Sequence, residues 1–203
     1  ENDLFKNTWV IFTADHGEML GDHHMSQKNL FFEGSAHVPL LIMPPQGRSL
    51  PYNISVEAPA DLVDIYPTIL AMAGLSSPVS VSGKNLLEPV PMDRMFFGNS
   101  LNKNFCVMEE KVKLVYSAVG DHVLLFDLNT DPMEQHNLAE DPAWQERKAK
   151  LWKLLLEHTA QYTPEALDEN GQFLTYEAPH FPGDVPGRWF GFHYHDYSVD
   201  TFH

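Results

Sequence analysis

The chain has 203 residues, of which 28 are acidic and 13 basic, and its formal net charge is −15 with the eleven histidines neutral. Hydrophobic residues make up 43% of the chain and aromatic residues 12%, which is enough apolar material for a core and argues against disorder. The acid excess argues against nucleic acid or an anionic membrane surface as the main partner. No apolar run approaches the roughly 20 residues that a membrane span needs, and the single cysteine excludes a disulfide framework.

The first two apolar runs predict buried strands. Residues 8–14 read TWVIFTA and residues 38–43 read VPLLIM. Such β-branched and aromatic runs are typical of strands buried on both faces of a parallel sheet. Because two strands alone do not make a stable sheet of that kind, we expect their neighbours to lie in an upstream part of a larger protein.

A helix is predicted over residues 61–73, DLVDIYPTILAMA, where apolar side chains recur at helical spacing. Pro67 would interrupt a helix interior, so a kink or a short turn is expected before it. Gly74 is a natural C-terminal cap. The serine- and proline-bearing loop over residues 75–91 is the predicted boundary between two parts of the fold.

Four short strands are predicted next, at residues 94–98, 104–108, 112–118 and 122–127. Gly120 lies between the last two strands and predicts an antiparallel hairpin. An amphipathic helix follows over residues 144–162. Its apolar face is predicted to contain Trp144, Ala149, Trp152, Leu155 and Leu156.

The segment directly after the first predicted strand carries the candidate chemistry. Residues 13–28 read TADHGEMLGDHHMSQK, and ligands of open α/β sheets bind beyond the carboxyl ends of the strands. Asp15 and His16 occupy that position, and together they could ligate a divalent cation. Lys28 could stabilise charge on a sulfate or phosphate oxygen. Taken alone, an Asp-His pair in a loop is more often a plain turn with a solvated histidine.

The same string, continued as NLFFEGSAHVPLLI, resembles the active-site segment of type I sulfatases, which belong to the alkaline phosphatase superfamily. It is most similar to the branch of choline sulfatases, iduronate-type sulfatases and phosphonate monoester hydrolases. There, a strand ends in Asp-His-Gly and a lysine follows 13 positions after the aspartate, as Lys28 follows Asp15. DIYPTILAMAG and LFDLNTDPMEQHNLAEDP resemble later motifs of the family, and several ordered motifs over residues 8–160 are jointly specific.

The resemblance implies roles for five residues. Asp15 and His16 would be ligands of the active-site divalent cation, which is usually Ca²⁺ in sulfatases. Because Ca²⁺ prefers oxygen ligands, the imidazole leaves Mn²⁺ open. Lys28 would be the catalytic group that contacts the sulfate oxygens, and His23 and His24 would bind the substrate.

The nucleophile of the family is absent from this sequence. Sulfatases use a formylglycine made from the Cys or Ser of a C/S-x-P-S-R motif, and an upstream Asp-Asp pair completes their metal site. Cys106 lies in NFCVMEE, without proline or arginine at the required positions, so we interpret it as a buried strand cysteine. We expect the nucleophile in an upstream part, and we expect this chain alone to be inactive.

The resemblance also implies the fold class, α/β. We expect the C-terminal part of an alkaline-phosphatase-like α/β sandwich over residues 1–90 and a small antiparallel sheet subdomain with a packed C-terminal helix over residues 91–162. The aromatic-rich tail, residues 163–203, should pack on the body or on a partner subunit of a homo-oligomer. Its polar cluster fits a covering segment better than a zinc site; the cluster comprises His193, His195, Asp196 and His203.

Three functions are compatible with these observations. The first is a sulfatase that acts on a sulfated small molecule or a sulfated carbohydrate. The second is a phosphodiesterase or phosphonate monoester hydrolase with the same loop, and the third is a non-catalytic C-terminal assembly module. The organic part of the substrate is not encoded in these motifs, and one unpaired cysteine fits the cytoplasm as well as the periplasm.

Overall fold

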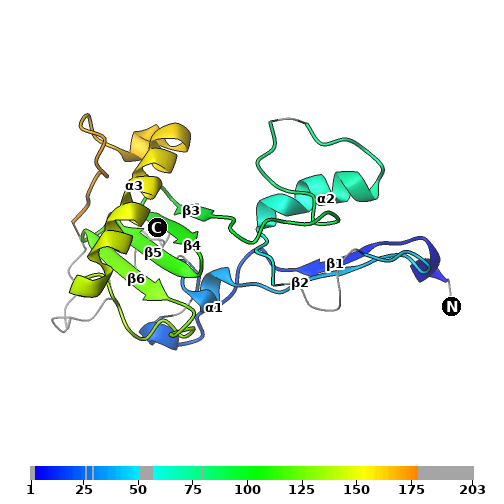
Figure 1. Ribbon diagram of the computed structural model, residues 1–203, viewed down its shortest axis with the longest axis horizontal. Helices are drawn as coiled ribbons and strands as arrows, with labels where there is room; N and C mark the ends of the chain where they lie inside the picture. The colour runs from blue at the N-terminus through cyan, green and yellow to red at the C-terminus, as the bar shows by residue number, and fades with distance from the viewer. Residues whose placement is uncertain (1–2, 26, 29, 51–56, 79, 178–203) are drawn as a thin grey trace, which may run out of the picture. The chain divides into compact units, whose positions relative to one another are not determined.

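Two compact units make up the protein (Figure 1). The computed structural model describes residues 3–25, 27–28, 30–50, 57–78 and 80–177. The first unit combines Glu1–Asp15 with Val38–Arg94, and the second combines His16–His37 with Met95–His203. No helix among the described residues is long and apolar enough to cross a membrane.

The first unit contains a two-stranded sheet, β1 (Val10–Thr13) and β2 (Leu40–Met43), preceded by the 3-10 turn η1 (Leu4–Lys6). The strands pair antiparallel, so the predicted parallel arrangement is wrong for this pair. The physical reason is that the chain re-enters β2 at the same end at which it left β1. The composition of an apolar run does not depend on the direction in which the strand runs. The two runs therefore predicted that strands form, but not whether they pair parallel or antiparallel. The predicted burial of both strands is also not seen in the structure, since the side chains of Phe12 in β1 and Leu41 in β2 are 61% and 58% exposed.

The helix of the first unit follows a short turn, as predicted. The 3-10 turn η3 (Leu62–Asp64) leads into α2 (Ile65–Met72). Pro67 is the third residue of α2, where a backbone N–H would have had no helical partner, so the proline costs no hydrogen bond. Gly74 ends the helix at φ +73°, a left-handed conformation that glycine adopts without strain.

A buried carboxylate holds the start of α2. The Asp64 side chain is fully buried, and both of its oxygens accept hydrogen bonds from the Arg94 guanidinium, one at 2.9 Å. The same carboxylate accepts from the backbone N–H of Asp61 at 2.8 Å and of Lys84 at 2.7 Å. These bonds compensate the buried charge and fasten residue 84 of the following loop to the beginning of the helix.

We predict that Asp64→Ala lowers the free energy of unfolding by about 3–5 kcal/mol, because it leaves the Arg94 guanidinium and two backbone N–H groups without their partner. Urea unfolding of the full chain measures the loss. Asp93→Ala is the matched control, since Asp93 is exposed, and it should change stability by less than about 0.5 kcal/mol. Equal losses in the two variants would contradict this role for Asp64.

The second unit is built on a four-stranded antiparallel sheet. Its strands are β3 (Phe96–Ser100), β4 (Asn104–Glu109), β5 (Val112–Ser117) and β6 (His122–Asp127), paired in sequence order. All four predicted strands are confirmed, with small shifts at their ends. β5 and β6 form the predicted hairpin, and Gly120 has φ +74° in its turn.

The predicted long helix is confirmed as α3 (Gln145–Tyr162), which lies across one face of this sheet (Figure 1). The 3-10 turn η4 (Pro142–Trp144) precedes it, and the Asp141 side chain caps that turn by accepting from a backbone N–H at 2.8 Å. The turn that leads into α3 therefore begins with an aspartate cap followed by a proline, which are common residues at helix starts.

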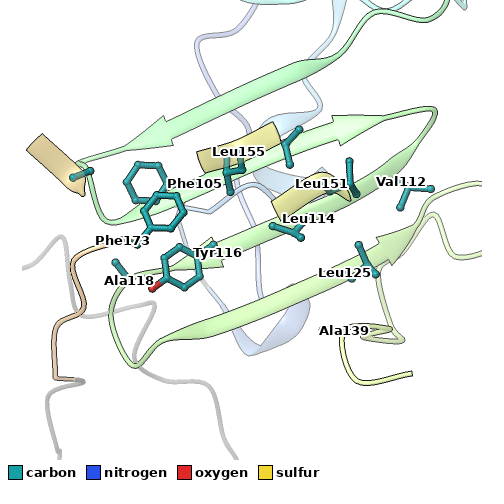
Figure 2. Packing of buried hydrophobic residues seen from close by; sticks show 12 residues of the cluster. Phe105, Val112, Leu114, Tyr116, Ala118, Leu125, Ala139, Leu151, Leu155 and Phe173 are labelled. Atoms are coloured by element: carbon teal, nitrogen blue, oxygen red, sulfur yellow. The ribbon is translucent and has the colours of Figure 1, made fainter. Parts of the chain in front are cut away.

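The core between α3 and the sheet is aromatic and aliphatic (Figure 2). Leu151 and Leu155 are the helix residues buried most deeply. The predicted apolar face is corrected at two positions, since it omitted Leu151 and included Ala149, which is exposed. Trp152 packs edge-on against Tyr116 with ring centroids 4.9 Å apart. The buried cluster comprises Phe105, Val107, Val112, Leu114, Tyr116, Ala118, Leu125, Ala139, Leu151, Leu155, Ala166 and Phe173.

The opposite face of the sheet is covered by the segment over residues 16–37. This segment contains η2 (Asp22–His24) and α1 (Glu33–Ala36). Because both faces are covered, all six residues of β5 are buried. The second cluster comprises Met19, Met25, Leu30 and Phe32 of this segment with Cys106, Val115, Leu124 and Phe126 of the sheet.

The tail is described as far as residue 177. The 3-10 turn η5 (Pro164–Ala166) follows α3. The Phe173 ring then enters the core, with its centroid 4.6 Å from those of Phe105 and Tyr116, so this part of the tail packs on the second unit. The residues of the tail's polar cluster lie outside the described residues: His193, His195, Asp196 and His203.

Candidate active site

The loop that follows β1 folds back on itself, so that its two ends meet. The Met19 N–H donates to the Gln27 carbonyl at 3.0 Å, and the Gly21 N–H donates to the Met25 carbonyl at 2.7 Å. Met19 and Met25 are buried in the apolar cluster under the sheet. These contacts return the chain at residue 28 to the neighbourhood of residue 16.

His16 and Lys28 are in direct contact, although twelve positions separate them in sequence. Lys28 Nζ lies 2.5 Å from His16 Nε2, and His16 Nδ1 lies 2.8 Å from the carbonyl oxygen of Gly17. Because a carbonyl oxygen only accepts, Nδ1 carries the ring proton and Nε2 presents its lone pair to the lysine ammonium. An imidazole held in this way has the tautomer of a metal ligand that coordinates through Nε2.

Asp15 directly precedes His16 in the chain and is exposed. It closes the first segment of the first unit, whereas His16 opens the second unit. Within the described part of the chain, no group of three or more His, Cys, Asp or Glu side chains is arranged to hold a metal ion. Asp15 and His16 are therefore a pair of adjacent candidate ligands and not a complete metal site.

His23 stacks on Phe32, with ring centroids 4.1 Å apart and planes 15° from parallel. Its backbone has φ +51°, in the left-handed region that residues with a side chain rarely adopt. The stacking covers one face of the imidazole and sets its orientation. His24 belongs to the same turn, η2, and its side chain lies outside the described part of the structure.

Helix α1 packs closely against the loop through Gly17 and Ser35. The Gly17 N–H donates to the Ser35 carbonyl at 2.7 Å, and Ser35 Oγ donates to the Lys28 carbonyl at 2.6 Å. A Cβ atom on Gly17 would lie 2.1 Å from the backbone oxygen of Gly34. Only glycine fits at this position, because any side chain would push the helix away from the loop.

A buried charge cluster anchors α1 to the sheet. Lys113 of β5 is 3% exposed, and its ammonium donates to Glu33, to Glu134 at 2.9 Å and to the Phe31 carbonyl at 2.8 Å. Glu134 also accepts from the Glu33 N–H at 2.7 Å. Burial by itself would lower the pKa of Lys113, but attraction to the two carboxylates outweighs it. The pKa is raised, and the ammonium stays charged at neutral pH.

Comparison with protein-family models identifies the family of the chain that carries His16 and Lys28. The family model described as N-sulphoglucosamine sulphohydrolase, C-terminal (SGSH_C), matches residues 21–161, which include Lys28, Ser35 and Lys113. The chain belongs to this sulfatase family. It corresponds to the C-terminal portion of type I sulfatases, and the predicted α/β fold class is confirmed by the solved structures that it resembles.

Several known proteins are similar to this sulfatase chain. The uncharacterized sulfatase YidJ of Escherichia coli is 32% identical over 165 residues, which cover 75% of this chain and 32% of that protein. The crystal structure of the phosphonate monoester hydrolase of Agrobacterium radiobacter is 32% identical, with a TM-score of 0.58 over 81% of this chain and 38% of that one.

A further solved structure holds its substrate, D-glucosamine-2-N,6-O-disulfate. It is 23% identical to this chain, with a TM-score of 0.60 over 78% of this chain and 35% of that one. A likeness at this identity shows the shared fold alone. The chain spans about a third of the length of the curated relatives it matches.

Cys106 is a structural residue of the sulfatase chain. It lies in β4 and is 6% exposed. Burial raises the pKa of its thiol to about 12, so the thiol stays protonated and unreactive at neutral pH. This confirms the interpretation of Cys106 as a buried strand cysteine.

Sequence reasoning singled out His16 and Lys28 but missed the residues that hold them together, Ser35, Lys113 and Glu134. Only Lys113 carried a signal, since it interrupts the otherwise apolar strand run VKLVYSA, and a buried lysine needs acidic partners. Those partners stand 80 and 21 positions away. Nothing in the sequence pairs them, because the pairing depends on the packing of segment 16–37 against the sheet.

We predict that Lys113→Met lowers the free energy of unfolding by about 3 kcal/mol, because Glu33 and Glu134 lose the ammonium that compensates their charge. Urea unfolding of the full chain measures the effect. Lys153→Met is the control, since the Lys153 side chain is 77% exposed and its loss should cost less than about 0.5 kcal/mol. Wild-type stability in the Lys113 variant would show that the cluster does not anchor α1.

Proposed function

We propose that the whole protein hydrolyses sulfate esters and that this chain supplies part of its active site. The observation that carries the proposal is the 2.5 Å contact between Lys28 Nζ and His16 Nε2 in a member of the sulfatase family. The contact brings a cation beside an imidazole with the tautomer of a metal ligand. Hydrolysis of an oxyanion ester uses both kinds of group.

Lys28 would contact the sulfate oxygens and stabilise the charge that develops on them. A lysine ammonium is a compact charge with three rotatable donors. When a cation takes the single lone pair of His16 Nε2, the ammonium would turn from that nitrogen to the incoming anion. Lys28 is exposed, and its ammonium lies within reach of solvent and solutes. Electrostatic stabilisation of this kind is commonly the largest single contribution to such a reaction.

Asp15 and His16 would be two ligands of a divalent cation, with Ca²⁺ expected and Mn²⁺ as the alternative. The His16 tautomer fits this role, since Nδ1 donates to the Gly17 carbonyl and Nε2 carries the lone pair. Ca²⁺ prefers oxygen ligands, and the imidazole is the reason for keeping Mn²⁺. When bound, the cation acts as a Lewis acid on a substrate oxygen. Further ligands and the formylglycine nucleophile would come from outside these 203 residues.

His23 and His24 would contact the organic part of the substrate. The His23 ring is oriented by its stacking on Phe32, and its ring nitrogens offer a donor and an acceptor for hydroxyl groups. We propose a sulfated carbohydrate or another sulfated small molecule as the substrate. Support comes from the family description, which names a sulphated glucosamine, and from the solved neighbour that holds a disulfated one.

Phosphonate monoester hydrolysis is the second candidate function. The observation that favours it is the 32% identity to the Agrobacterium radiobacter enzyme. Lys28 and a metal at Asp15 and His16 would serve this reaction equally well, because sulfate and phosphonate esters both present negatively charged oxygens around a tetrahedral centre.

We predict that Lys28→Ala in the full-length protein lowers kcat/KM for 4-nitrophenyl sulfate by about 100-fold, the usual effect of removing one donor that stabilises an oxyanion. Steady-state hydrolysis measures the change, and thermal unfolding should show little loss of stability because the side chain is exposed. Lys153→Ala, at an exposed position on α3, is the control and should keep the wild-type rate. A wild-type rate for Lys28→Ala would remove Lys28 from the mechanism and favour a non-catalytic module.

A second prediction compares substrates on one preparation of the full-length protein, stripped of metal by a chelator and reloaded with Ca²⁺ or Mn²⁺. Metal removal is expected to abolish hydrolysis, because the cation polarises the ester oxygen. After reloading, kcat/KM for the sulfate ester should exceed that for the matching phosphonate monoester. Faster turnover of the phosphonate ester, or of a phosphodiester, at equal metal loading would favour the second candidate.

A further inference from the structure

We propose that Ser35 is a positioning residue that holds the Lys28 backbone so that the Lys28 ammonium lies beside His16. This inference rests on the proposed function of Lys28. Ser35 is 3% exposed, so it would act through Lys28 and not on the substrate. Its role was not apparent from the sequence, where it is one small residue of FFEGSAHVPL.

Ser35 bonds to both ends of the active-site loop. Its hydroxyl donates to the Lys28 carbonyl at 2.6 Å, and its own carbonyl accepts from the Gly17 N–H at 2.7 Å. Gly17 is the neighbour of His16 in the chain. A single buried residue thus fixes the main chain on both sides of the contact between His16 and Lys28.

The Lys28 side chain needs such a fixed backbone. It is exposed and has four rotatable bonds, so packing does not hold it in one conformation. A displaced backbone would move the range of positions that the ammonium can reach away from His16 Nε2. Positioning errors of about 1 Å can cost large factors in rate even when the displaced group lies far from the substrate.

Helix α1 is a firm support for Ser35 despite its length of four residues. Glu33, two positions before Ser35, is bonded through its side chain to Lys113 and through its N–H to Glu134 at 2.7 Å. Both partners are almost fully buried. A buried polar network whose hydrogen bonds are all made holds its members in one arrangement. The network therefore fixes α1, and the hydrogen bond from the Ser35 hydroxyl fixes the Lys28 carbonyl relative to α1.

Ser117 of β5 provides a matched control. It is 2% exposed, and its hydroxyl donates to the Val119 carbonyl at 3.2 Å. Ser35→Ala and Ser117→Ala each remove one buried hydroxyl from one backbone carbonyl. Both variants should therefore lower the unfolding midpoint by a comparable amount, and only Ser35→Ala should change the reaction.

The test is a double-mutant cycle in the full-length protein with a fluorogenic aryl sulfate as the substrate. Ser35→Ala should lower kcat/KM by about 10-fold, while Ser117→Ala should lower it by less than about 2-fold. In the Lys28→Ala background, Ser35→Ala should have less than about a 2-fold further effect, because the group through which Ser35 acts is already gone. A merely structural role would not produce this lack of additivity.

The outcomes distinguish failure of the positioning role of Ser35 from failure of the proposed function. If Lys28→Ala lowers the rate but Ser35→Ala costs the same factor with and without Lys28, the positioning role is overturned and the proposed function stands. An equal loss of rate in Ser35→Ala and Ser117→Ala overturns the positioning role as well. If Lys28→Ala leaves the rate unchanged, the proposed function itself fails, and the role of Ser35 fails with it.

Discussion

The second unit depends on one buried ammonium, that of Lys113. Lys113 is the second residue of a strand whose residues are all buried, where an unpaired charge would cost several kcal/mol. Its three protons meet two carboxylates and one carbonyl oxygen, so the charge is compensated by groups from outside the strand. Two of those groups belong to Phe31 and Glu33. Because Lys113 must bond to them, its position in β5 fixes the position of α1 and of the residue that precedes Phe32.

Apolar packing and charge pairing make different contributions to this placement. The methionines and phenylalanines of segment 16–37 bury the face of the sheet opposite α3, which supplies most of the driving force but has little directional preference. The ion pairs and the bonds to backbone groups are directional, and they select one position for α1 among the many that burial would permit. The position of α1 in turn fixes the loop with His16 and Lys28, because Ser35 of α1 bonds to the Gly17 N–H and to the Lys28 carbonyl.

Most of the groups proposed for the active site, Asp15, His16 and Lys28, would act on the oxyanion and not on the organic part of the substrate. A lysine ammonium and a metal held by Asp15 and His16 would serve a sulfate and a phosphonate alike. His23 and His24 are proposed to contact the organic part, and stacking on Phe32 gives the His23 ring a defined orientation. Substrate choice would therefore depend on few groups here, which agrees with the likeness of the chain to sulfatases and to phosphonate monoester hydrolases.

Local sequence determined much of this protein. Residue patterns predicted α2, α3, the four strands of the second unit and the hairpin of β5 with β6, because these elements depend on neighbours within a few residues. The Asp-His-Gly string and Lys28 identified the candidate site by its chemistry. The tertiary structure alone decided the antiparallel pairing of β1 with β2, the bonds from Ser35 to the two ends of the loop, and the partners of Lys113. These features join residues distant in sequence, and directional contacts between distant segments leave no periodic pattern in a sequence.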